Sequence, residues 1–187
     1  MKENGHQRKS LVYIAGFMGS GKSTIGPILA NTLGFEFLDI DKCVEQKAQK
    51  RIVEIFATEG EQAFRSIEFQ SLKEVASRHR CVIALGGGTI ANEENFRLIR
   101  ESGIIVYLQL SPGEILQRVH HRTDRPLLTR TDGTKLPMDE IQQRVEDLLQ
   151  KREQFYGRAD VVIQTDRKRV GATVDEIVRR LRGLVDA

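Results

Sequence analysis

A glycine-rich stretch between an apolar run and a helical pattern constrains the fold of this chain most. The stretch GFMGSGKST covers residues 16–24 and directly follows the apolar run LVYIAG, residues 11–16. After it, four apolar residues recur at the spacing of one helix face: Ile25, Ile28, Leu29 and Leu33. Gly34 then provides a typical helix stop. The predicted order is therefore strand, tight loop, helix.

Apolar runs and helical segments continue to alternate toward the C-terminus. The further strand candidates are FEFLDID, CVIALGGG, GIIVYLQL and VVIQT. Polar or amphipathic helical sequence separates them, including a long predicted helix from about Met138 to Arg158. The runs are continuous rather than alternating, which is typical of parallel strands buried on both faces. We therefore predict an α/β fold with five parallel strands flanked by helices.

Length and composition favour one globular domain without a nucleic-acid or membrane partner. A length of 187 residues predicts a single domain, placed over residues 11–187, and the polar opening MKENGHQRKS predicts a frayed tail over residues 1–10. Lys and Arg number 29 and Asp and Glu 26, so the net charge of +3 is too small to indicate nucleic-acid binding. No apolar run reaches the length of a signal peptide core or a membrane span. Cys43 and Cys81 lack metal-site or dithiol spacing, which predicts free thiols and a cytoplasmic protein.

The glycine-rich stretch fits a phosphate-binding loop. Gly16 to Ser23 match the pattern of glycine, four residues, glycine, lysine and serine or threonine. Such a loop turns consecutive backbone N–H groups toward a polyphosphate, and the following helix adds the positive end of its dipole. Lys22 is expected to reach the β- and γ-phosphates, and the Ser23 hydroxyl to bind Mg²⁺. The alternative is a plain glycine-rich turn.

Two aspartates indicate which class of nucleotide-binding protein this is. A GTPase would need an Asn-Lys-x-Asp stretch and a motor an apolar strand ending in Asp-Glu, and the sequence has neither. Asp39 and Asp41 instead follow a strand, and on an extended segment both carboxylates face one crevice. Asp39 suits the outer shell of the metal, and Asp41 suits binding or deprotonation of an acceptor hydroxyl. A helix cap after the strand is the alternative for either residue.

Two further motifs predict that the acceptor is a small anion. Arg65 and Glu68, in FRSIE, share a helix face, so Glu68 is placed to orient a guanidinium that takes a ligand carboxylate. Residues 86–88, in LGGGT, are all glycines, which allows a substrate to rest against main-chain N–H groups. The alternatives are a surface salt bridge and a tight strand-to-helix turn.

An arginine-rich stretch interrupts the alternation. Residues 118–137 carry two prolines and four arginines: Arg118, Arg122, Arg125 and Arg130. Loops of this length are usually functional or disordered, and we predict a mobile lid rather than a solvated surface excursion. His120 and His121 receive no role and are interpreted as solvated residues at a helix end.

These motifs together resemble the shikimate kinase family. From Leu11 to Leu184 the chain carries, in the family's order, GFMGSGKST, DID, FRSIE, LGGGT, the pair Arg125 and Pro126, and REQFY at residues 152–156. The family often has a proline within the last motif, where this chain has none. The phosphate loop is generic, whereas the ordered set is specific.

The resemblance implies a P-loop NTPase fold with strand order 2-3-1-4-5 and a mobile lid. It also implies a typically monomeric enzyme that transfers the γ-phosphate of ATP, with Mg²⁺, to the 3-hydroxyl of shikimate in aromatic amino acid biosynthesis. Lys22, Asp41 and Arg125 would be catalytic, and Ser23 and, through water, Asp39 would serve the metal. Nucleotide contacts are expected from Gly19, Ser20, Gly21, Lys22, Ser23, Thr24, Arg118, Arg125, Arg167 and Lys168. Shikimate contacts are expected from Asp41, Arg65, Gly86, Gly87, Gly88 and Arg152.

Two rival functions remain open at this point. Another small-molecule kinase, such as a gluconate kinase or a nucleoside monophosphate kinase, would use the same phosphate loop, although LGGGT and the motif order argue against it. The second rival is a nucleotide-dependent binding or switch protein without a small-molecule acceptor.

Overall fold

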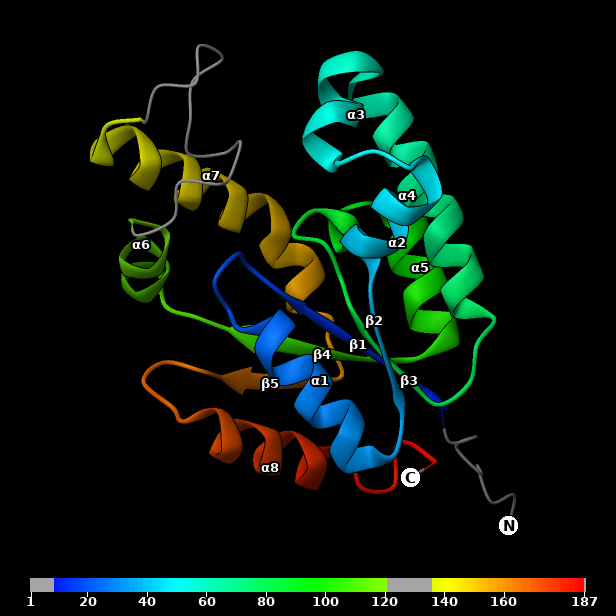
Figure 1. Ribbon diagram of the computed structural model, residues 1–187. Coiled ribbons are helices and arrows are strands. Elements are labelled where there is room, and N and C mark those ends of the chain that lie inside the picture. Colours follow the sequence, from blue (N-terminus) through cyan, green and yellow to red (C-terminus); the bar gives the residue numbers. More distant parts are fainter. Residues whose placement is uncertain (1–8, 121–135, 187) are drawn as a thin grey trace.

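A parallel sheet organises the residues that the computed structural model describes, which are 9–120 and 136–186 (Figure 1). Its strands are β1 (Leu11–Gly16), β2 (Glu36–Asp39), β3 (Cys81–Ala84), β4 (Ile104–Gln109) and β5 (Val161–Gln164). The order within this part of the chain is β2-β3-β1-β4-β5, and every neighbouring pair is parallel. The predicted fold class and strand order are thus confirmed.

The central strand β1 explains why an uninterrupted apolar run forms a strand here. Leu11 and Tyr13 point into one hydrophobic cluster, whereas Val12 and Ile14 point into the cluster on the opposite face. All four side chains are at most 1% exposed. Because successive side chains in a strand alternate between faces, burial on both faces requires apolar residues throughout.

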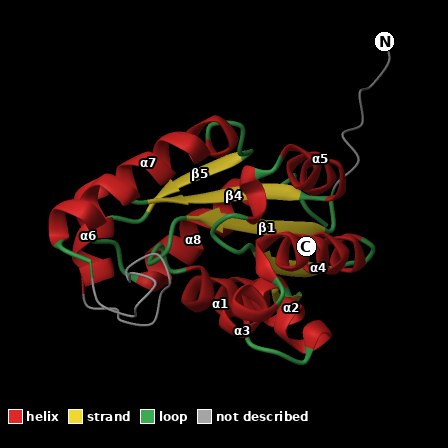
Figure 2. Cartoon of the chain, turned by 90° about the horizontal axis from the view of Figure 1, so that it is seen from above, coloured by secondary structure: helices red, strands yellow, loops and turns green. Residues whose placement is uncertain are grey.

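Helices cover both faces of the sheet. On one face, α1 (Lys22–Leu33) and α8 (Val170–Leu181) bury Leu29 and Ile177 against the sheet. On the other face, α4 (Gly60–Ala76), α5 (Glu93–Ser102) and α7 (Met138–Tyr156) contribute Leu72, Phe96 and Phe155. Figure 2 shows α5 and α7 on one side of the strands and α1 on the other.

Shorter elements complete the edge of the fold that carries the motifs. After β2 come α2 (Ile40–Ala48) and α3 (Ile52–Thr58), and a 3-10 turn, η1 (Thr89–Ala91), follows the triple glycine. Helix α6 (Pro112–His120) packs with α7 around a third apolar cluster that contains Phe17, Ile115 and Ile141. Phe17 thereby anchors the glycine-rich loop against these two helices.

Several boundaries differ from the predictions. Helix α7 ends at Tyr156 rather than near Arg158, and Ile28 is 43% exposed although it lies in the apolar repeat of α1. Within the predicted tail, the backbone N–H of Lys9 donates to the Leu184 carbonyl at 3.0 Å. The residues after α8 offer backbone partners there, so the described end of the tail is not frayed.

The predicted lid lies mostly outside the described residues. Arg122, Arg125, Arg130 and His121 all fall within residues 121–135. The two ends of the predicted segment belong to the fold instead: Arg118 is part of α6, and Leu136 is 4% exposed within the third apolar cluster. None of the described helices is long and apolar enough to cross a membrane.

The N-cap of α5 yields a stability prediction. The Asn92 side chain accepts from the backbone N–H groups of Glu94 and Asn95, at 2.9 and 3.0 Å. Asn92→Ala should therefore lower the free energy of unfolding by about 1 kcal/mol, measured by urea denaturation. Asn31→Ala, an exposed substitution within α1, is the matched control and should not lower it. Equal effects of the two substitutions would contradict the capping role.

Candidate functional site

The glycine-rich loop lies at the carboxyl end of the central strand and leads directly into α1. Gly19 and Gly21 have φ angles of 81° and 97°, which side-chain-bearing residues rarely adopt. Helix α1 begins at Lys22, so Ser23 and Thr24 are exposed in its first turn. The loop therefore presents backbone N–H groups and a helix N-terminus to one place, as phosphate binding requires.

Lys22 and Ser20 have different surroundings in the loop. The Lys22 ammonium group donates to the carbonyl oxygens of Gly16 and Phe17, at 2.7 and 3.2 Å. The Ser20 side chain is buried, and its hydroxyl oxygen has no hydrogen-bond partner among the described residues. The loop is thus held by its own lysine.

The paired aspartates are arranged differently from the prediction. Strand β2 ends at Asp39 and α2 begins at Ile40, so the two aspartates do not share an extended segment. Asp39 is the N-cap of α2, and its Oδ1 accepts from the Asp41 backbone N–H at 3.0 Å. Asp39 therefore caps a helix, as its alternative interpretation anticipated, because the helix starts inside the motif; capping leaves its carboxylate partly exposed, so a metal role stays a prediction. Asp41 lies in the first turn of α2, and Ile40 is fully buried.

The three glycines after β3 adjoin three of the predicted acceptor residues. A methyl group on Gly86 would place its carbon 2.4 Å from Asp41 Oδ1. The carbon of a methyl group on Gly87 would lie 3.4 Å from Arg152 Nη1. On Gly88, that carbon would lie 3.2 Å from Arg65 Nη2. The structure therefore brings Asp41, Arg65 and Arg152 together around one stretch of backbone that carries no side chains.

Arg65 is fixed by carboxylates. Its Nη1 donates to Glu68 Oε2 at 2.9 Å, and its Nε and Nη2 lie 3.3 and 3.2 Å from Glu61 Oε1. Burial alone would lower the pKa of Arg65, but the charge and hydrogen bond of Glu68, with those of Glu61, raise it overall. Because Glu68 is only 1% exposed, the pair is not an ordinary surface salt bridge. The predicted orienting contact of Glu68 is confirmed.

Arg152 is held in another way. It is 8% exposed, and its guanidinium carbon lies 5.2 Å from the centre of the Phe17 ring. It makes no ion pair with any residue that the structure describes. Burial raises the pKa of Tyr156, one turn further along α7, while the Arg152 charge opposes that rise. A buried cation of this kind favours an anionic ligand.

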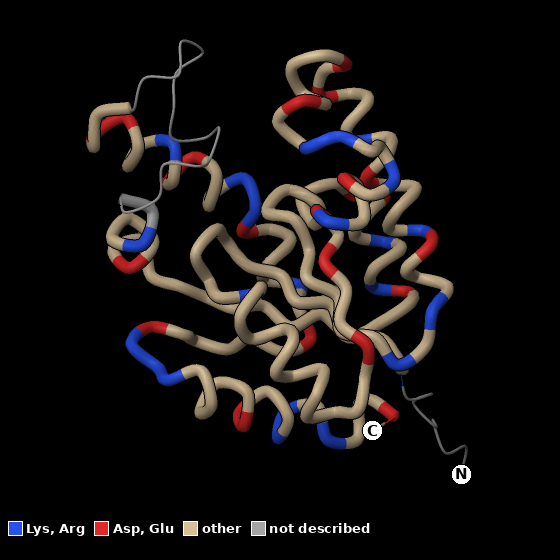
Figure 3. Tube along the Cα trace, in the orientation of Figure 1, with Lys and Arg blue, Asp and Glu red and all other residues tan. Residues whose placement is uncertain are grey.

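The predicted nucleotide-side cations lie on α6 and on the loop before α8. Arg118 Nη1 donates to the Gly19 carbonyl at 2.8 Å, which joins α6 to the glycine-rich loop. Glu114 lies 3.5 Å from Arg118 Nε and 3.6 Å from Arg167 Nε. Lys168 pairs with Glu176 at 2.8 Å. Figure 3 shows the basic segment between β5 and α8. Arg125 is outside the described residues.

The oxygen donors near the loop fit a magnesium ion. Ser23 offers an exposed hydroxyl, and Asp39 offers a partly exposed carboxylate. Within residues 9–120 and 136–186 there is no cluster of three or more His, Cys, Asp or Glu residues suited to a metal. Mg²⁺ bound to nucleotide phosphates needs only one or two protein oxygens and keeps several waters, so this donor set is sufficient.

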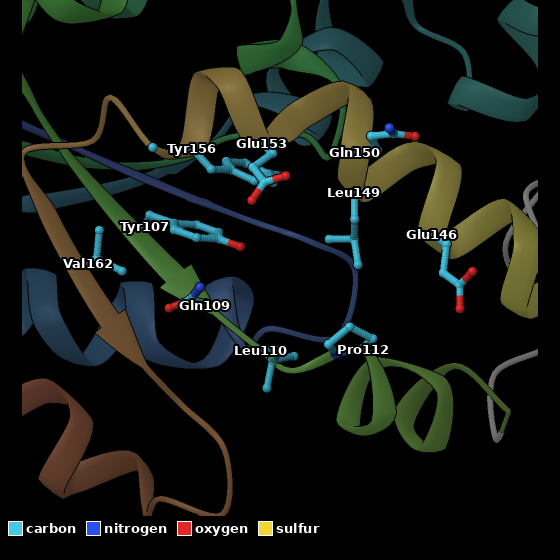
Figure 4. Close-up of a pocket in the computed structure, with 11 residues that line it drawn as sticks. Tyr107, Gln109, Leu110, Pro112, Glu146, Leu149, Gln150, Glu153, Tyr156 and Val162 are labelled. Carbon is cyan, nitrogen blue, oxygen red and sulfur yellow. The ribbon is translucent and has the colours of Figure 1, made fainter.

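A pocket of about 460 Å³ lies elsewhere, between α7 and the strands β4 and β5 (Figure 4). Within it, the rings of Tyr107 and Tyr156 stack with their centres 4.3 Å apart. Burial, with smaller contributions from Tyr156 and Glu153, raises the pKa of Tyr107 to about 12. None of the residues predicted for nucleotide or acceptor binding lines this pocket.

Three contacts of the site were not anticipated from the sequence. Phe17 lies against Arg152, Glu61 pairs with Arg65, and the Thr89 hydroxyl donates to Glu68 Oε1 at 2.6 Å. Glu61 has a sequence signal, since it precedes Arg65 by one helical turn. Phe17 and Thr89 lie inside recognised motifs, but their contacts depend on tertiary packing.

Comparison with known proteins agrees with this geometry. A family model described as shikimate kinase matches residues 18–182. A shikimate kinase of Chlorobaculum tepidum is 51% identical over 172 residues, which cover 92% of this chain and 90% of that protein.

Solved structures separate the candidate families. A shikimate kinase from Acinetobacter baumannii in complex with shikimate has a TM-score of 0.81 and 35% identity, covering 91% of this chain and 92% of its own. A gluconokinase from Sinorhizobium meliloti has a TM-score of 0.57 at 21% identity, covering 95% of this chain and 93% of its own, which shows a shared fold alone. The family match, the identity over nearly the whole chain and the arginines around the triple glycine lead to one conclusion: this chain belongs to the shikimate kinase family.

Proposed function

We propose that this protein transfers the γ-phosphoryl group of ATP to the 3-hydroxyl of shikimate, giving shikimate 3-phosphate and ADP. The step belongs to chorismate and aromatic amino acid biosynthesis. Family membership supports the activity. The observation that carries it is the convergence of Asp41, Arg65 and Arg152 on the bare backbone of residues 86–88. That arrangement suits a small, hydroxylated carboxylic acid.

On the acceptor side, the two arginines are proposed to hold the carboxylate of shikimate. Arginine suits this role because its planar guanidinium binds a carboxylate in a fixed orientation. The backbone of Gly86, Gly87 and Gly88 would lie against the ring of the substrate. Asp41 would then bind the reacting hydroxyl and accept its proton as the phosphoryl group is transferred.

On the donor side, we propose nucleotide contacts from the loop residues Gly19 to Thr24. Lys22 would exchange its contacts with loop carbonyl oxygens for the β- and γ-phosphates. Arg118, Arg167 and Lys168 would bind the nucleotide from α6 and the loop before α8. Bound by Ser23 and, through water, by Asp39, Mg²⁺ would neutralise phosphate charge. From the sequence resemblance alone, we propose that Arg125 contacts the transferring phosphate.

Other features of the proposal rest on composition and family resemblance. They are a single kinase domain over residues 11–187, a monomeric state, a cytoplasmic location and the absence of nucleic-acid and membrane partners.

An acceptor panel tests the proposed function. Purified protein with ATP and Mg²⁺ should release ADP rapidly with shikimate and only at background level with gluconate, a nucleoside monophosphate or no acceptor. A coupled ADP assay measures this, and mass spectrometry of the product should find one added phosphoryl group. Faster turnover with gluconate or a nucleoside monophosphate would overturn the assignment. Equal turnover without an acceptor would indicate a nucleotide-dependent switch instead.

The first active-site prediction concerns Arg65. Arg65→Ala should weaken shikimate binding by about 2 kcal/mol, the scale for a lost charge-assisted hydrogen bond. ATP binding should change little, since the side chain adjoins Gly88 rather than the phosphate loop. Titration calorimetry with each ligand checks both statements. Normal shikimate affinity in the variant would remove Arg65 from the acceptor site.

Substitution of Glu61 should strengthen shikimate binding, in contrast to substitution of Arg65. It is 67% exposed and occupies the edge of Arg65 that Glu68 leaves open, so it competes with a substrate carboxylate for the same guanidinium. Glu61→Gln should therefore lower the KM for shikimate by about two- to fivefold, the range of an exposed ion pair.

The matched control is Glu74→Gln, which removes an equally exposed carboxylate paired with Lys47 on α2. Its KM for shikimate should equal that of the wild type. A higher KM in Glu61→Gln would mean that Glu61 supports the acceptor site rather than competing for Arg65.

A further inference from the structure

A buried polar chain connects the arginine motif to the triple-glycine motif. Glu68 Oε2 accepts from Arg65 Nη1 at 2.9 Å, and its Oε1 accepts from the Thr89 hydroxyl at 2.6 Å. The Asn95 side-chain amide donates to the Thr89 carbonyl at 2.8 Å. Thr89 and Glu68 are at most 1% exposed, and Asn95 is 4% exposed. Helices α4 and α5 are therefore linked through η1.

Each oxygen of the Glu68 carboxylate has a separate partner. A buried carboxylate is costly unless both oxygens are hydrogen-bonded, and a bond at each oxygen fixes the plane of the group. Thr89 holds one oxygen, so the other faces Arg65. Without the hydroxyl, the carboxylate would be free to turn both oxygens toward the guanidinium.

The Thr89 hydroxyl also adjoins the first glycine of the motif. A methyl group on Gly86 would lie 2.8 Å from Thr89 Oγ1 and 2.4 Å from Asp41 Oδ1. Thr89 is thus next to the backbone that Asp41 faces and is bonded to the carboxylate that holds Arg65.

We infer that Thr89 is a positioning residue for the acceptor site and acts through Glu68 on Arg65. The inference rests on the proposed function, because its readout is the binding of shikimate. Thr89 does not touch the substrate in this scheme. Its hydroxyl fixes the carboxylate that orients the guanidinium, and the guanidinium holds the substrate carboxylate.

A purely structural role for Thr89 would have different consequences. Loss of a buried hydrogen bond would then lower stability and the amount of active protein, while leaving the KM values for both substrates unchanged. A role exerted through Arg65 raises the KM for shikimate, spares the KM for ATP and disappears when Arg65 is absent.

Thr89→Val removes the hydroxyl at nearly constant side-chain volume and leaves Glu68 Oε1 without its partner. We expect the KM for shikimate to rise about tenfold, because the Glu68 carboxylate would no longer hold Arg65 in one orientation; a tenfold change matches the usual size of one lost buried hydrogen bond. The KM for ATP should stay within about twofold. Thr89→Ser keeps the hydroxyl and should restore the wild-type KM. Thr173→Val is the matched control, because Thr173 in α8 is 1% exposed and its hydroxyl donates to the carbonyl of Arg169, the N-cap residue of that helix.

The decisive measurement is the double variant Arg65→Ala/Thr89→Val. Its shikimate affinity, measured by calorimetry, should equal that of Arg65→Ala alone. The guanidinium through which Thr89 acts on the substrate is absent from both variants. A full additional loss in the double variant, or a wild-type KM in Thr89→Val, would overturn the inference while leaving the proposed function intact. If Thr89→Val does not fold, Thr89→Ala takes its place with the same expectation. Wild-type protein that neither binds nor phosphorylates shikimate would overturn both.

Discussion

The acceptor side of the structure depends on one constraint: residues 86–88 are glycines and have no side chains. Asp41 from α2, Arg65 from α4 and Arg152 from α7 each approach a different glycine, and the closest approach would bring a methyl carbon within 2.4 Å of a carboxylate oxygen. Strand β3 lies between β2 and β1 in the sheet. The same strand order therefore places the glycines beside the paired aspartates on one side and beside the phosphate loop on the other.

The two acceptor-side arginines are held by different forces. Arg65 is oriented by a buried carboxylate, Glu68, and its charge is largely balanced before any ligand binds. Arg152 lies over the Phe17 ring, with no ion pair among the described residues. Arg65 therefore contributes mainly orientation, while Arg152 contributes positive charge that no carboxylate among residues 9–120 and 136–186 pairs with. A carboxylate ligand that reaches both gains a fixed geometry from one and a larger electrostatic attraction from the other.

Local patterns predicted most of the fold and part of the site. The continuous apolar run of β1 and the Arg65–Glu68 spacing depend on near neighbours, so sequence alone reveals them. The extended segment expected to hold both Asp39 and Asp41 is wrong, because nothing in the motif shows that a helix begins at Ile40. The bond between Thr89 and Glu68, and the packing of Phe17 under Arg152, join segments far apart in the chain. Such contacts depend on how the helices pack against the sheet, and the hydrophobic periodicity of the sequence does not specify that packing.

The cations of the nucleotide side and of the acceptor side differ in how many of their contacts within the protein a ligand has to replace. Lys22 and Arg118 donate to carbonyl oxygens of the glycine-rich loop, and Arg118 and Arg167 both lie near Glu114. A polyphosphate has to replace these contacts with its own oxygens. The free energy gained from its contacts is therefore partly offset by the loss of the contacts within the protein. On the acceptor side, the contact between Arg65 and Glu68 can persist while another edge of the guanidinium binds the ligand. Only the exposed contact of Arg65 with Glu61 has to give way there, so less of the acceptor site than of the nucleotide site has to rearrange when its ligand binds.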